Sequence, residues 1–208
     1  MKGGGQFPWA VPRELDAVST MVDQKKLIHL TSDDLRIIPP GQRLVVNVEE
    51  HIVTLFWPAT EKILAQGHFP PSAFRTLVVL LKSPRGASYA ELLAGLHCTE
   101  EVLKQLLAAR TSDDVPEFQA LASHWQDHLV EATSRLEKDP EAWEREVKPV
   151  RWAVKEKRGV QAIARKNGFG WRVRGLSRKG YVLLRAPAPA SEQAEAHVSL
   201  TASRTAPR

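Results

Sequence analysis

The segment from Glu144 to Arg185 constrains the fold most strongly, because nearly all of its charge has one sign. It holds thirteen Lys or Arg against three Glu, a net charge of +10, whereas the whole chain of 208 residues carries only +5. Such a segment has to turn its many cations toward water and can bury only a narrow apolar stripe. Positive charge concentrated in this way usually faces a polyanion, and we favour nucleic acid as that partner. A solvated charged face on an ordinary helix and hairpin is the alternative.

The apolar residues of this segment first follow a helical period. They recur at spacings of four, three and four, which places them on one side of a helix and the cations on the other: Trp143, Val147, Val150 and Val154. This spacing predicts a helix that extends to about Lys157. A proline inside a helix costs about 3 kcal/mol, so we expect the helix to begin near Pro149, with the proline in its first turn.

After Gly159 the apolar spacing falls to two, which is typical of strands. Asn167-Gly168 predicts a tight turn between two short strands, and a further hairpin is expected over 173–184. A basic helix followed by a basic hairpin is the arrangement of the recognition helix and the wing in a winged helix-turn-helix protein. The sequence therefore predicts this arrangement for the basic segment.

Upstream, residues 27–66 are rich in β-branched and aromatic side chains, which predicts a sheet. We expect a turn at Glu49-Glu50 and strands over 44–48, 51–57 and 62–65.

Two helices are expected next. Pro70-Pro71-Ser72 opens the first, which ends before Ser83-Pro84-Arg85-Gly86. Ser88 and Glu91 form a capping box, in which each side chain bonds the backbone N–H of the other, at the start of the second helix.

Residues 99–143 separate the second helix from the basic segment and are acidic. They hold ten Asp or Glu against four Lys or Arg, and their leucine spacing predicts helices. We interpret them as a helical insertion. Its acidic face either docks a partner protein or simply packs on the domain, and the sequence leaves both alternatives open.

The two ends differ in composition from the middle of the chain. We expect residues 1–26 to be a flexible arm with a short helix around Glu14–Val22, residues 27–185 to be the folded domain, and residues 186–208 to be a disordered tail. No apolar run is long enough to cross a bilayer, and the start lacks the apolar centre of a signal peptide. Cys98 is the only cysteine, so it cannot form an intrachain disulfide and is expected in the core. These features favour a cytoplasmic protein.

Two runs of the sequence resemble the effector domain of the OmpR/PhoB-type winged-helix transcription regulators. The first, from Phe69 to Leu93, has the family's Leu-rich helix, its Pro- and Gly-containing turn and its Ser-x-x-Glu-Leu-Leu second helix. The second matches the spacing of the family's wing hairpin at Ile163, Gly168, Phe169, Gly170, Trp171 and Val173. The resemblance spans residues 42–174, and the β-rich run before Phe69 matches the family's amino-terminal sheet. No receiver domain is expected to precede it.

The resemblance implies an α+β fold. It consists of a winged helix-turn-helix with an amino-terminal antiparallel β-sheet, here enlarged by the helical insertion, and a carboxy-terminal β-hairpin wing. The function it implies is a transcriptional regulator that binds double-stranded DNA, with the helix over 147–157 in the major groove. The expected DNA-binding residues are Lys148, Arg151, Lys155, Lys157, Arg158, Arg165, Lys166, Arg172 and Arg174. We expect the last four of these on the wing or the hairpin beyond it, against phosphates or the minor groove.

The alternative function is a protein-interaction module that docks on RNA polymerase or another transcription protein through the acidic insertion. The sequence leaves the oligomeric state open, with a homodimer as one alternative. We expect no enzymatic activity and no cofactor, since neither a phosphate-binding glycine loop nor a nucleophile-elbow motif occurs. His124, His128 and Glu131 share one helix face at zinc-ligand spacing, but Trp125 stands where a metalloprotease has Glu, and we expect no metal there.

Overall fold

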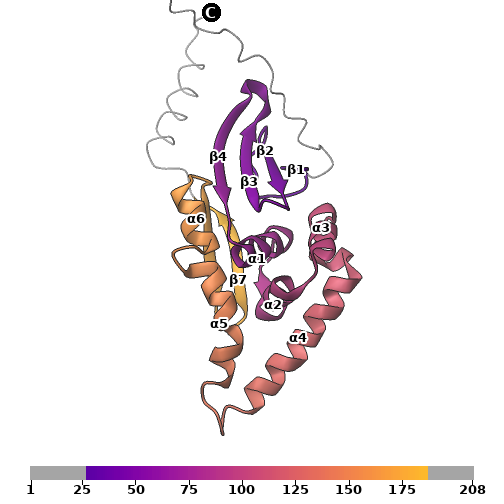
Figure 1. Ribbon diagram of the computed structural model, residues 1–208, viewed down its shortest axis with the longest axis vertical. Coiled ribbons are helices and arrows are strands. Elements are labelled where there is room, and N and C mark those ends of the chain that lie inside the picture. The colour runs from indigo at the N-terminus through magenta and orange to yellow at the C-terminus, as the bar shows by residue number, and fades with distance from the viewer. Residues whose placement is uncertain (1–26, 187–208) are drawn as a thin grey trace, which may run out of the picture.

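The computed structural model describes residues 27–186, and four strands in chain order form an antiparallel sheet at one end of it (Figure 1). They are β1 (Leu27–Thr31), β2 (Arg43–Asn47), β3 (Ile52–Trp57) and β4 (Lys62–His68), with the short 3-10 turn η2 (Pro58–Thr60) before β4. Side chains alternate across the sheet, so Val46 and its cross-strand neighbour Val53 are both buried against the core. The strands expected from the sequence are confirmed to within one residue, except that β4 continues three residues further, to His68.

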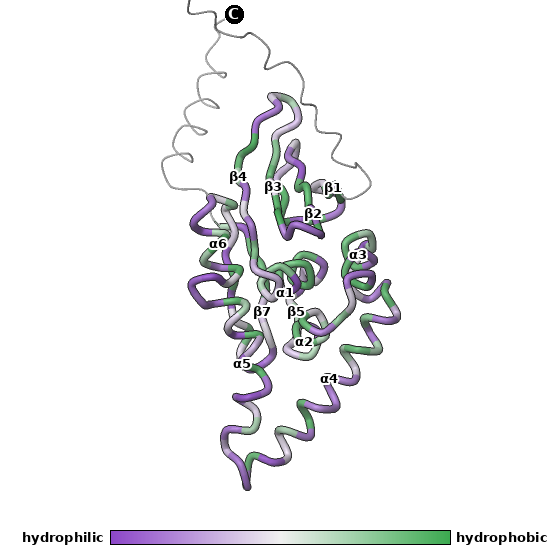
Figure 2. Tube along the Cα trace, viewed as in Figure 1, coloured by the Kyte–Doolittle hydropathy of each residue, from purple (hydrophilic) through white to green (hydrophobic). Residues whose placement is uncertain are grey.

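Helix α1 (Pro71–Lys82) lies at the centre of the molecule, and nine of its twelve residues are buried. It packs against α2, α3, α5, α6 and β7, and Figure 2 shows apolar residues along much of it. Its predicted start and end are confirmed. A two-residue strand, β5 (Ala87–Ser88), leads from it into α2 (Tyr89–His97).

The predicted capping box at the start of α2 is confirmed. The backbone N–H of Glu91 donates to Ser88 Oγ at 3.1 Å, and the backbone N–H of Ser88 donates to Glu91 Oε2 at 2.7 Å. Cys98, directly after this helix, is buried as expected.

The segment after α2 is helical and packs closely on the domain. It forms α3 (Glu100–Ala108), the turn η3 (Ser112–Asp114) and the long α4 (Pro116–Ser134), which lies along α2 and then turns back into α5. Phe118 and Leu129 on α4 are buried. Lys82, although buried, donates to the Ala109 carbonyl at 2.7 Å, and its burial lowers the pKa of this amine. The insertion therefore shares the core of the domain.

Helix α5 (Ala142–Lys155) carries most of the basic face, and it begins earlier than the expected start near Pro149. Pro149 lies inside the helix rather than in its first turn. The proline removes one backbone donor, but it is exposed, while Val147, Val150 and Val154 are buried on the other side. Their burial offsets the cost of the proline, so the helix continues through it.

The hairpin expected around Asn167-Gly168 is wrong. Residues 160–166 form a helix instead, α6 (Val160–Lys166), which buries Val160, Ile163 and Ala164 at helical spacing. The side chain of Asn167 donates to the Ile163 carbonyl at 2.9 Å, so this residue caps the helix. Gly168 does adopt the expected positive φ, at 73°, but as the residue that ends a helix.

The hairpin expected over 173–184 is confirmed. Strands β6 (Trp171–Leu176) and β7 (Gly180–Arg185) pair antiparallel, and β5 pairs with the other edge of β7 in a three-stranded sheet of order β5-β7-β6. The backbone N–H of Tyr89 donates to the Lys179 carbonyl at 3.0 Å, so the hairpin turn is bonded to the first residue of α2.

The fold is thus α+β, with the predicted amino-terminal sheet and carboxy-terminal hairpin. The expected arm over 1–26 and nearly all of the expected tail lie outside the described residues; Ala186 donates its N–H to the Gly170 carbonyl. Between residues 27 and 186, no helix is long and apolar enough to cross a membrane.

The junction between β5 and β7 supplies a stability prediction. A Cβ on Gly180 would lie 1.9 Å from the backbone oxygen of Ala87, and the φ of Gly180 is 152°. We expect Gly180→Ala to lower the free energy of unfolding by more than about 3 kcal/mol in urea titration, because a backbone atom cannot move aside. Gly168→Ala is the matched control: its Cβ meets no atom within 4 Å, so only the cost of a positive φ remains, about 1–2 kcal/mol. Equal losses in the two variants would contradict the close approach.

Candidate nucleic-acid interface

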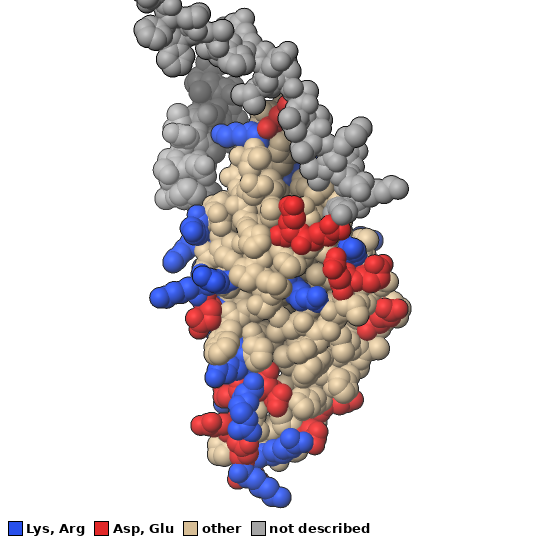
Figure 3. Space-filling model, viewed as in Figure 1, with Lys and Arg blue, Asp and Glu red and all other residues tan. Residues whose placement is uncertain are grey.

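We call the cations of α5 beyond its first turn, of α6 and of the turn between them the basic surface. It comprises Lys148, Lys155, Lys157, Arg158, Arg165 and Lys166, all exposed, together with the partly buried Arg151. On the face seen in Figure 3, Lys and Arg project along the left side, over α5 and α6. Asp and Glu gather on the right, over α3 and the start of α4, and others lie among the cations over α5.

The two lysines of α5 lie over aromatic rings. Lys148 Nζ is 4.9 Å from the centre of the Trp152 ring, and Lys155 Nζ is 5.5 Å from the centre of the Tyr181 ring. A ring face attracts a cation and also orders its flexible stem, yet it leaves the positive charge uncompensated. Both lysines therefore stay available to an anion.

Arg151 differs from the other predicted residues because its charge is already paired with an acidic side chain of the same chain. Both terminal nitrogens of its guanidinium donate to the two carboxylate oxygens of Glu144. A hydrogen bond to Tyr89 raises the pKa of Arg151 above its usual value. The side chain thus joins the first residue of α2 to the middle of α5, which makes Arg151 a positioning residue in the free protein.

Tyr89 and Tyr181 extend this network to the hairpin. Their rings meet edge to face, with centroids 5.8 Å apart, and both side chains are buried. Burial, and then the hydrogen bond to Tyr89, raise the pKa of Tyr181 to about 12. Arg151, Tyr89, Tyr181 and Lys155 therefore fix α5 against both α2 and the hairpin.

The two cations of β6 lie on a different surface from those of α5. Arg172 and Arg174 are exposed on the face of β6 opposite to the buried Trp171 and Val173. Arg178 occupies the hairpin turn and lines a hollow of about 470 Å³ together with Arg151 and Glu144. The cations of α5 and α6 therefore lie together, whereas Arg172 and Arg174 lie on a separate face of the hairpin.

Two of the residues expected on the wing lie elsewhere. Arg165 and Lys166 belong to the last turn of α6, not to a hairpin, because residues 160–166 are helical. Cations at this end of a helix are favoured by the partial negative charge of its carbonyls. Lys157 and Arg158 lie in the turn that follows α5, which ends at Lys155.

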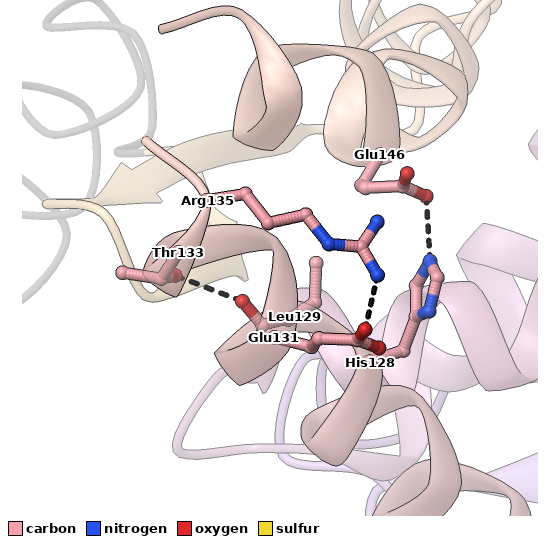
Figure 4. Close-up of polar contacts among 6 residues, drawn as sticks. All are labelled: His128, Leu129, Glu131, Thr133, Arg135 and Glu146. Atoms are coloured by element: carbon pink, nitrogen blue, oxygen red, sulfur yellow. Dashed lines mark hydrogen bonds and ion pairs between the residues drawn. The ribbon is translucent and has the colours of Figure 1, made fainter. Parts of the chain in front are cut away.

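Two side-chain contacts join the acidic insertion to the base of α5. His128 Nε2 lies 3.0 Å from Glu146 Oε2, and Arg145 pairs with Asp139 (Figure 4 shows the first of these). Glu131, on α4, is turned to Arg135 instead. The three residues with zinc-ligand spacing are thus not gathered around one point, and no cluster of three metal-ligating side chains occurs within residues 27–186.

Trp152 is the exposed residue that the sequence prediction missed. Its side chain is 56% exposed, although large aromatic side chains are usually buried. The signal was present in the sequence, since Trp152 falls outside the stripe of Trp143, Val147, Val150 and Val154. On the predicted helix, Trp152 therefore lies on the same side as the cations.

Comparison of the chain with family models, with curated proteins and with solved structures found no match.

The tyrosine network predicts the alkaline behaviour of the protein. Because the folded pKa of Tyr181 lies above its ordinary value of 10.0, the stability that this group contributes is complete below pH 10. It is lost as the pH rises through about 12. Tyr89→Phe leaves Tyr181 as the single tyrosine of the chain, since the sequence contains two. In this variant we expect the absorbance of tyrosinate to appear well above pH 10, and near pH 10 in denaturant. A native midpoint near pH 10 would contradict the burial of the phenol.

Proposed function

We propose that the protein is a DNA-binding transcription regulator with a winged helix-turn-helix of the OmpR/PhoB type. In this proposal α5 enters the major groove, and the hairpin formed by β6 and β7 contacts the backbone or the minor groove beside it. The order of elements supports it. A four-stranded antiparallel sheet precedes α1, a capped α2 follows, and the basic helix comes before the hairpin. Helix α6 and the insertion of α3 and α4 are the additions of this chain.

One observation carries the proposal: most of the positive charge between residues 144 and 185 has no acidic partner among residues 27–186. Of the thirteen Lys and Arg in this range, only Arg145 and Arg151 form ion pairs in the described part of the chain. A chain that needed these charges only for solubility would gain by interspersing them with acids, as it does on α3, where Lys104 pairs with Glu100. Uncompensated cations on adjoining elements fit the phosphates of a nucleic acid.

Duplex binding as a function of salt tests the proposal. We expect the logarithm of the affinity for a mixed-sequence duplex to fall linearly with the logarithm of the salt concentration. Replacing both Lys157 and Arg158 by Gln should weaken binding and reduce the magnitude of the slope by about two, one for each phosphate that is no longer neutralised. Lys104→Gln is the matched control, because it removes a cation from α3, on the acidic side of the molecule. A protein that binds no duplex at low salt would overturn the proposal.

The substitution Glu144→Gln distinguishes between two roles for Arg151. If Arg151 mainly positions α5, Glu144→Gln loosens the helix and weakens DNA binding, even though it removes a negative charge from the interface. If Arg151 contacts DNA directly, the same substitution frees it and strengthens binding. From the bidentate contact and the bond to Tyr89 we expect weaker binding.

Arg151→Ala should lower the free energy of unfolding by about 1 kcal/mol, because the ion pair is largely exposed. Fluorescence anisotropy and urea titration measure the two effects.

A further inference from the structure

Trp152 lies on the exposed side of α5, near the carboxyl end of the helix, with more than half of its side chain open to solvent. It is flanked one helical turn away on each side by Lys148 and Lys155. Lys148 lies over the indole, and both lysines line the shallow hollow on the Arg151 side of Trp152. A bulky apolar ring held in this position between two lysines faces whatever the basic surface binds.

A second hollow adjoins Trp152 on the side of α1. This groove has a volume of about 600 Å³, which is within the range of about 300–1,000 Å³ typical of small-ligand clefts. Besides Trp152, its walls are formed by Pro70, Ser72, Pro149, Ala153, Glu156 and Arg158. Lys148 lines the hollow on the other side and not this groove, so the indole is open to a flat partner from the side of α1.

The chemistry of the groove suits a nucleobase better than a phosphate. The indole and the two prolines offer apolar, flat surface for stacking. Glu156 would repel a phosphate, whereas its carboxylate can accept a hydrogen bond from the amino group of a base. Arg158 at the rim can hold the adjoining backbone. Every base has a ring face, so stacking of this kind tolerates many sequences.

We propose that Trp152 stacks on an unpaired base, so that the ligand of the basic surface includes a single-stranded or locally opened stretch of DNA. The inference rests on the proposed function and specifies its substrate. In a closed duplex the grooves show only the edges of the bases, and their faces are covered by the neighbouring base pairs. An indole can lie flat on a base only after that base has left the stack.

Three oligonucleotide probes of equal length test the inference by fluorescence anisotropy at one low salt concentration. The first is a single strand of deoxycytidines, about sixteen nucleotides long, which matches the upper size of common single-strand sites. The second is an abasic strand with the same phosphates and no bases. The third is a closed duplex. We expect Trp152→Ala to weaken binding of the first probe about 5- to 100-fold and to leave binding of the abasic strand unchanged. Trp152→Phe should retain most of the affinity, because the ring face remains.

Matched variants separate stacking from other effects. Trp57→Ala removes another exposed tryptophan, 40% exposed at the end of β3, and should change no affinity. The Lys157 and Arg158 double variant should weaken binding of all three probes. If Trp152→Ala binds the single strand as well as the wild type does, or loses the abasic strand equally, the inference is wrong while the proposed function stands. If the wild type binds none of the probes, the inference and the proposed function are both wrong.

Discussion

The burial of α1 is the constraint on which the rest of the structure depends. Nine of its twelve residues are buried, and helices from every part of the described chain, together with β7, pack around it. Burying a single leucine or phenylalanine side chain contributes about 1.5–3 kcal/mol, so a helix of this composition can exist only if it is surrounded. The sheet, the insertion and the basic segment supply that cover. They leave their charged faces outward because their inner faces pack on α1 or, in the case of α4, on α2 and α5.

Two kinds of contact offset the repulsion among the cations of the basic segment. On α5, the apolar stripe of Val147, Val150 and Val154 anchors the helix, and the lysine stems rest on aromatic rings. At its base, Asp139 of the insertion pairs with Arg145, and Glu146 of α5 itself approaches His128. The insertion therefore serves the stability of the basic helix, whatever else its acidic face contacts. Beyond the first turn of α5, Arg151 is the only cation of the basic segment that forms an ion pair within residues 27–186.

Local signals in the sequence located most of the elements. The capping box at Ser88, the alternation in β2 and β3 and the proline-bounded α1 each depend on contacts within a few residues, so spacing alone predicts them. Pro149 and Asn167-Gly168 misled the prediction because tertiary packing decided both. Burial of one face carries α5 through its proline, and α6 is set by the packing of Ile163 and Ala164. The candidate site divides in the same way. Charge counts located the cations, but only the fold shows that Arg151 is already paired and that Arg172 and Arg174 face another side.

The bond between the Tyr89 amide and the Lys179 carbonyl, next to the two-residue pairing of β5 with β7, has a thermodynamic consequence for recognition. It joins the hairpin turn to the amino end of α2, and Tyr181 joins the same hairpin to α5. These parts therefore form one rigid body before any ligand arrives. A rigid surface loses little conformational entropy on association, so almost all of the ordering cost falls on the partner. The ordering cost of complex formation is then set by the freedom of the partner, and the heat of binding should carry little contribution from folding of the protein.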